Sequence, residues 1–105
     1  MIDALQARLA ALAASGQTIT YGALARDLGL SGPGVIAQLT DALETLMEID
    51  ASQDAPLRAA LCCGRLNGDL PATGFFDKAA DLGCLGTQDP LEFVRDQRAK
   101  LFLKP

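Results

Sequence analysis

Apolar residues recur three or four positions apart through the first half of this chain, and short turn-forming segments divide them into separate stretches. The first stretch covers residues 2–14 and ends before Gly16. The second covers residues 21–28, with Thr20 as a favourable N-cap and Gly29 as its end. This spacing is typical of amphipathic helices. It predicts that the first half of the chain forms helices whose apolar faces pack into a core.

A third apolar stripe follows a turn at residues 31–34 and extends to about residue 49. Pro33 suits the first turn of a helix, because a proline there leaves no amide hydrogen unpaired. The apolar residues of this helix are Val35, Ile36, Leu39, Leu43, Leu46 and Met47. Two helices joined by a short turn over residues 20–49 predict a helix-turn-helix.

A hairpin is expected next. Residues 57–63 are apolar at all but one position and predict a strand. The pair Asn67-Gly68 is a strong signal for a two-residue hairpin turn. A second strand over residues 69–75 would complete the hairpin, although Pro71 weakens it because proline cannot donate a ladder hydrogen bond. A hairpin after a helix-turn-helix is a wing, here over residues 57–75.

Two more helices are expected after the hairpin, over residues 76–83 and 89–103. Asp89 can cap the second of them, and Pro90 suits its first turn. The apolar residues expected to face the core from this helix are Leu91, Val94, Leu101 and Phe102. The whole pattern predicts a single domain that is mainly α with a small β hairpin (α+β): a winged helix-turn-helix with extra C-terminal helices.

The composition agrees with a single helical domain, and the net charge limits the classes of partner that it can bind. At 105 residues the chain has room for one core, and 50% of its residues are hydrophobic but only 5% aromatic, which favours helices over a large sheet. The net charge of −4 disfavours nucleic acid and anionic membranes unless the cations are clustered. There is neither a long apolar run nor a signal-peptide pattern, so we expect a cytoplasmic protein without a membrane span.

Two segments resemble motifs of a known family. Residues 20–25 read Thr-Tyr-Gly-Ala-Leu-Ala, which resembles the Thr-Tyr-Gly-x-x-Ala segment that begins the helix-turn-helix of the alkylguanine-DNA alkyltransferases. Residues 62–66 read Cys-Cys-Gly-Arg-Leu, which resembles that family's Pro-Cys-His-Arg-Val motif at the entry to the wing. The similarity is to the family's C-terminal domain and to the related alkyltransferase-like proteins, and it covers roughly residues 17–76.

The resemblance implies where a partner would bind. The residues singled out for binding nucleic acid or another partner are Thr20, Tyr21, Gly22, Arg26 and Arg65. Cys63 falls on the family's alkyl-accepting cysteine, which the family activates through a neighbouring histidine. Gly64 stands in the place of that histidine, and the chain contains no histidine at all.

The loss of the histidine bears directly on catalysis. Without a base or a nearby cation, the thiol of Cys63 would be mostly protonated at neutral pH, since an unperturbed cysteine has a pKa of about 8.5. We therefore expect no alkyl transfer unless this thiol is active, and we interpret Cys63 as a small buried hydrophobe. Three cysteines without paired spacing or histidine do not predict a zinc site, so neither a metal nor another cofactor is expected.

The charge pattern argues against DNA contact through the third helix. From Asp27 through Leu57 the chain has no Lys or Arg, and a recognition helix without cations repels phosphates. The acidic residues of this region are Asp27, Asp41, Glu44, Glu48, Asp50 and Asp54. Arg65 either reaches a ligand across the wing or pairs with Asp69 over the hairpin. The late cations are expected on a solvated helix face: Arg95, Arg98, Lys100 and Lys104.

These observations predict a non-catalytic winged-helix module that acts through a protein partner or as a homodimer. The alternative is an alkyltransferase-like protein that recognises modified DNA without alkyl transfer. Tyr21 and Gly22 also have interpretations that require no bound partner. Tyr21 would pack its ring and leave its hydroxyl in water, and Gly22 would be needed because DNA or a neighbouring helix approaches it closely. Phe75 and Phe76 are expected in the core rather than on a base-stacking surface.

Overall fold

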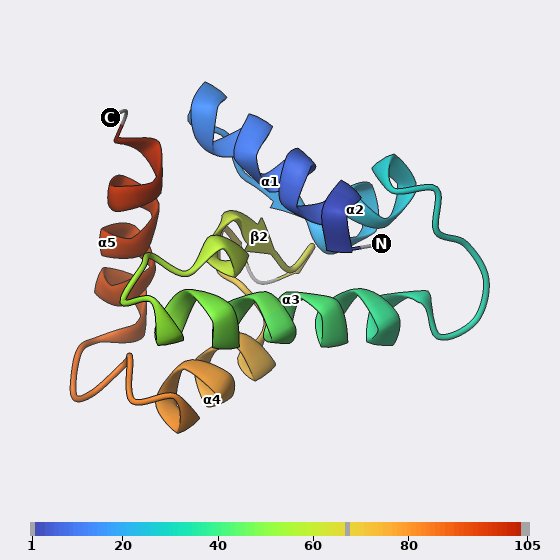
Figure 1. The fold of residues 1–105 in the computed structure, drawn as a ribbon. Helices are drawn as coiled ribbons and strands as arrows, with labels where there is room; N and C mark the ends of the chain where they lie inside the picture. Colours follow the sequence, from blue (N-terminus) through green and yellow to red (C-terminus); the bar gives the residue numbers. More distant parts are fainter. Residues whose placement is uncertain (1, 67, 104–105) are drawn as a thin grey trace.

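Helices make up most of the structure. The computed structural model describes residues 2–66 and 68–103, which form α1 (Ile2–Ser15), β1 (Ile19–Thr20), α2 (Tyr21–Asp27), α3 (Val35–Ser52), the 3₁₀ helix η1 (Arg58–Leu61), β2 (Cys62–Cys63), α4 (Thr73–Asp81) and α5 (Pro90–Phe102) (Figure 1). Helix α3 crosses the middle of the molecule in Figure 1, with α1 and α2 above it, α4 below it and α5 near its C-terminal end. The chain is therefore mainly helical with a small sheet, an α+β arrangement.

Every α-helix contributes apolar side chains to one core. The large buried ones are Leu5, Leu9 and Leu12 from α1, Leu24 from α2, Leu39, Leu43, Leu46 and Met47 from α3, Phe75 from α4, and Phe93 and Val94 from α5. The predicted stripes of the first and third helices are confirmed, except that Ile36 at the start of α3 is 44% exposed. The prediction that Phe75 and Phe76 belong to the core is also confirmed, since Phe76 packs against it at the edge of the Phe75 ring.

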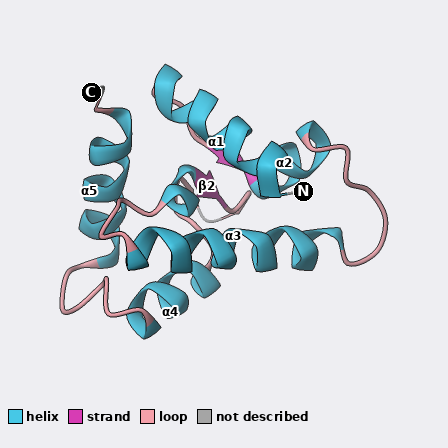
Figure 2. Ribbon diagram, in the orientation of Figure 1, coloured by secondary structure: helices cyan, strands magenta, loops and turns pink. Residues whose placement is uncertain are grey.

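The sheet differs from the predicted hairpin. Strands β1 and β2 pair in parallel, with Ile19 opposite Cys62 and Thr20 opposite Cys63. Figure 2 shows how short these strands are beside the helices. The strand predicted over residues 57–63 is instead η1 followed by β2. Residues 69–75 form no strand, because α4 begins at Thr73 and not at residue 76 as predicted, and it ends at Asp81. The hairpin pairing predicted over residues 57–75 is therefore wrong; of its turn, Asn67 lies outside the described residues.

The physical reason is that a short buried apolar run suits either a strand or a helical turn. Ala59, Ala60 and Leu61 are all buried, so their sequence carries no alternation that would distinguish the two. Pro71 is also buried and has no amide hydrogen with which to extend a ladder beside β2. Residues 64–66 and 68–70 belong to no strand, and a hydrogen bond of 2.9 Å from the Gly64 amide to the Leu70 carbonyl closes this segment, which we call the 64–70 loop.

Helices α2 and α3 stand where the helix-turn-helix is predicted, but the connection between them is longer. Gly29 and Gly34 have positive φ angles of 73° and 75°, a conformation that favours glycine. Helix α3 therefore begins at Val35, after Pro33, and continues to Ser52. The connection over residues 28–34 exceeds the three- or four-residue turn that is usual in this motif.

The predicted inward face of α5 is confirmed for Val94, Leu101 and Phe102, which are buried in the core or packed against it, but not for Leu91. Phe93, Val94 and Arg98 are buried, whereas Leu91 is 42% exposed. The interpretation of Arg98 as part of a solvated face is therefore wrong. The exposed positions of Arg95 and Lys100 agree with that interpretation, and Lys104 lies outside the described residues.

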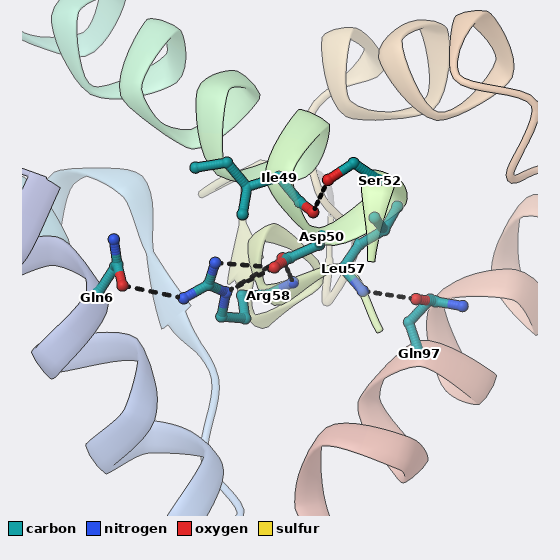
Figure 3. A network of polar contacts seen from close by, with 7 residues as sticks. All are labelled: Gln6, Ile49, Asp50, Ser52, Leu57, Arg58 and Gln97. Carbon is teal, nitrogen blue, oxygen red and sulfur yellow. Dashed lines mark hydrogen bonds and ion pairs between the residues drawn. The ribbon is translucent and has the colours of Figure 1, made fainter. Parts of the chain in front are cut away.

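A network of polar contacts joins four elements near the C-terminal end of α3 (Figure 3). Asp50 is 3% exposed and accepts hydrogen bonds from the backbone amide of Arg58 at 2.9 Å and from its guanidinium, which lies 2.8 Å away as an ion pair. The same guanidinium reaches Gln6 of α1 at 3.4 Å. The amide of Leu57 donates to Gln97 of α5 at 2.7 Å. These contacts fix η1, and with it the position of β2.

The network also corrects the charge pattern read from the sequence. Asp50 does not belong to an exposed acidic surface of α3, because it is enclosed and neutralised by Arg58. Arg58 in turn is committed to that pair and is not available to an anionic partner.

Candidate binding site

Thr20, Tyr21, Gly22, Arg26 and Arg65, the five residues singled out from the sequence, line one surface hollow of about 580 Å³, together with Ala23 and Ile36. We call this cavity the α2 hollow. Three of the five lie at the junction of β1 and α2, where Thr20 caps the helix by accepting a hydrogen bond from the Ala23 amide at 3.2 Å, and Arg26 lies in the last turn of α2. Arg65 comes from the loop after β2. The parallel pairing of Thr20 with Cys63 brings the two segments side by side.

The α2 hollow is cationic although the protein is acidic. Arg26 and Arg65 are exposed, and neither forms an ion pair within residues 2–66 and 68–103. No carboxylate is among the described residues that line the hollow. The predicted pair between Arg65 and Asp69 is wrong, because Asp69 pairs with Arg98 at 2.9 Å. The guanidinium of Arg65 is therefore left for solvent or a ligand.

Tyr21 has a structural role in addition to lining the hollow. Its hydroxyl accepts a hydrogen bond of 3.0 Å from the amide of Ala72, just before α4 begins. Burial raises the pKa of Tyr21 to about 12, so the phenol is neutral under ordinary conditions. The expectation of a hydroxyl left in water is therefore wrong. Its ring also borders a small apolar cavity of about 50 Å³ between α3 and α4.

Gly22 faces open space. A Cβ placed at this residue would meet no atom within 4 Å, so no neighbouring helix requires glycine here. The absence of a side chain keeps one wall of the α2 hollow open. Of the two reasons considered for this glycine, close approach by a neighbouring helix is excluded for the described residues.

Cys63 lies beside β1 and does not line the α2 hollow. It is 7% exposed, and its Sγ lies 3.6 Å from the carbonyl oxygen of Ile19. Burial raises the pKa of the Cys63 thiol, and burial raises that of Cys62 to about 12. Both thiols therefore stay protonated at neutral pH, and the interpretation of Cys63 as a small buried hydrophobe is confirmed.

Sequence reasoning missed Ile36 and the support of the loop by α5. Ile36 lies at the N-terminal end of the apolar stripe of α3, so its sequence position predicts burial. Its exposure beside the hollow depends on how the helices pack and carries no sequence signal. Arg98 carried a weak signal, since it follows the core residue Val94 by four positions and so shares its helix face.

The described residues contain neither a candidate metal site nor a helix that could span a membrane. No group of three or more His, Cys, Asp or Glu side chains in residues 2–66 and 68–103 is placed to hold a metal ion. Over the same residues, no helix combines the length and the apolar character that crossing a membrane requires.

Comparison of the chain with models of protein families, with curated proteins and with solved structures gave no match. The resemblance to the alkyltransferases thus stays a hypothesis that depends on the two sequence motifs.

Proposed function

We propose that this protein is a non-catalytic binding module and that the α2 hollow is its binding site. One observation carries the proposal: Arg65 and the motif residues of β1 and α2, which are far apart in the sequence, line the same cavity. Its volume of about 580 Å³ lies within the range of ligand pockets, roughly 300–1,000 Å³.

The partner that best suits the α2 hollow carries phosphate groups, and we assign it as DNA. Guanidinium groups bind phosphate in a bidentate manner, and Arg26 and Arg65 have no acidic partner among the described residues. Ile36 and Ala23 add an apolar wall against which a base or sugar can pack. The proposed contact uses α2 and the 64–70 loop, which avoids the acidic surface of α3.

In this proposal α2 and α3 act as a helix-turn-helix of the alkyltransferase type, and the 64–70 loop takes the place of the wing. The chain would recognise DNA, including modified DNA, without transferring an alkyl group. The buried and protonated thiol of Cys63 supports this, because thiolate is the nucleophilic form of cysteine.

The test is a titration of a fluorescently labelled duplex, with and without one alkylated guanine, followed by anisotropy at several salt concentrations. The variant Arg26→Ala/Arg65→Ala should bind at least about tenfold more weakly than the wild type, since charge-assisted hydrogen bonds are worth about 1.5–3 kcal/mol. The salt slope should fall by about 0.9 for each phosphate contact removed.

Arg95→Ala is the matched control, because Arg95 is exposed and lies outside the hollow. It should bind the duplex nearly as the wild type does. Equal binding by the double variant and this control, or no binding by the wild type at low salt, would refute the proposal. Tighter binding of the alkylated duplex would support recognition of modified DNA.

Protein contact is a second candidate function, favoured by exposed apolar side chains beside the hollow. Leu66 on the loop is 93% exposed and Ile36 is 44% exposed. A homodimer or a protein partner could cover them together with the acidic side of α3. Sedimentation velocity tests the homodimer: strictly monomeric behaviour at high concentration, together with tight duplex binding, would remove this candidate.

A further inference from the structure

Arg98 is the most buried cationic side chain among the described residues. It connects the core to the loop that carries Arg65. Arg98 is 8% exposed. Its Nε donates to the carbonyl of Ala60 in η1 at 2.8 Å. Its Nη1 donates to the carboxylate of Asp69 at 2.9 Å, and its Nη2 donates to the carbonyl of the same residue at 2.7 Å. One guanidinium thus joins α5, η1 and the 64–70 loop.

We propose that Arg98 is a positioning residue for the α2 hollow: it holds the 64–70 loop so that Arg65 faces the hollow opposite Arg26. The inference rests on the proposed function of the hollow as a binding site for DNA. Arg98 itself does not line the hollow, so it would act on the ligand only through the loop.

The loop is anchored at its end by Leu70, which packs against the core, and by the buried Pro71. Before Leu70, its described residues have little else to hold them. The ends of the loop are also fixed by the pairing of β2 with β1 and by the bond from the Ala72 amide to the Tyr21 hydroxyl. Between these ends, the Gly64–Leu70 hydrogen bond closes the loop upon itself and does not attach it to the core. The two bonds from Arg98 to Asp69 supply that attachment, four residues after Arg65.

Stability alone is a weak reason for such an arrangement. A buried cation is costly to desolvate, and an apolar side chain of similar size is often at least as stabilising. Asp69 has a side chain that is 76% exposed, so the pair is not a closed internal ion pair. Its geometry instead orients a surface loop, which a hydrophobic residue at position 98 could not do.

The decisive variant is Asp69→Asn, because positioning and simple electrostatics predict opposite results. Removing a negative charge near Arg65 should strengthen the binding of anionic DNA if charge alone matters. If Arg98 positions the loop through Asp69, the loosened loop must be ordered on binding. The affinity for the labelled duplex should then fall by about two- to tenfold.

Asp77→Asn is the matched control, since Asp77 is exposed on α4 and undergoes the same change of charge. Asp77→Asn should keep the wild-type melting temperature, because Asp77 is exposed and forms no ion pair among the described residues. Asp69→Asn should lower the melting temperature, because the buried Arg98 loses its charged partner but keeps its hydrogen bonds to the carbonyls of Ala60 and Asp69. Duplex binding is therefore compared well below the melting temperature of both variants. Exchange of the Gly64 amide with deuterium should be faster in Asp69→Asn than in Asp77→Asn. Arg98→Lys, which retains the charge but not the fork of donors, should weaken duplex binding in the same direction as Asp69→Asn.

The outcomes separate this inference from the proposed function. Unchanged or tighter binding by Asp69→Asn, while Arg26→Ala/Arg65→Ala binds weakly, would overturn the positioning role and leave the binding site standing. A wild-type protein that does not bind the duplex would overturn both. Weaker binding by Asp69→Asn than by Asp77→Asn, measured well below the melting temperature of both variants, is the result that the positioning role requires.

Discussion

Replacing Gly22 by alanine should change stability and duplex binding in opposite directions, and so separate the role of this glycine in the fold from its role in the α2 hollow. A Cβ at Gly22 meets no atom within 4 Å, so the unbound protein has room for the added methyl group. Gly22 is the second residue of α2, and alanine is the better helix former by about 0.5–1 kcal/mol. We therefore expect Gly22→Ala to raise the melting temperature by about 2–5 °C.

Binding should respond in the opposite direction. The methyl group would stand on the wall of the hollow, where the proposed DNA backbone approaches. Steric overlap of this size costs about 1–3 kcal/mol, which corresponds to duplex binding about 5- to 150-fold weaker. Circular dichroism on heating measures the first effect, and anisotropy of the labelled duplex measures the second.

Gly74 provides the control within the same molecule. It is the second residue of α4, and a Cβ there also meets no atom within 4 Å. It borders the small cavity beside Tyr21 instead of the α2 hollow. Gly74→Ala should therefore gain similar stability and bind the duplex normally. If Gly22→Ala binds as tightly as Gly74→Ala, the ligand does not enter the hollow beside α2, and the reasoning fails.

Three further predictions concern the polar network and the thiols. Asp50→Asn should lower the free energy of unfolding by about 1.5–3 kcal/mol in urea titrations, because the partly buried guanidinium of Arg58 loses the charge of its buried partner; a loss below about 0.5 kcal/mol would contradict this. The pKa of Cys62 is raised from 9.0 to about 12 on folding, so its contribution to stability is complete below pH 9.0 and is lost as the pH rises towards about 12. Cys62→Ala should therefore show a shallower fall of the urea midpoint over that interval than the wild type does. Incubation with the alkylated duplex should leave Cys63 unmodified in mass spectra, and an adduct on that residue would show that its thiol is active.

The helices were predictable because each carries its own local signal. The apolar spacing of α1, the cap at Thr20 and the Asp89-Pro90 start of α5 each act within a single element. The Asp89 carboxylate accepts hydrogen bonds from the amides of Leu91 and Glu92, as a cap at that position should. Local interactions of this kind do not depend on the rest of the fold.

The sheet and the ion pairs were not predictable, because they depend on partners far away in the chain. Nothing near residue 62 indicates that β1, rather than a following strand, will pair with it. Likewise, Asp69 has a nearer candidate in Arg65 but pairs with Arg98. The candidate binding residues were found through the motif resemblance, but their assembly into one cavity required the parallel strands.

The pairing of β1 with β2 also has a consequence for the order in which the site can form. Translation produces the part that carries Arg26 early, whereas the proposed role of Arg98 implies that Arg65 is oriented only after α5 has been made and has docked. A nascent or C-terminally shortened chain would carry Arg26 without an oriented Arg65. Ligand capture should thus report completion of the whole domain, not the presence of its first helices.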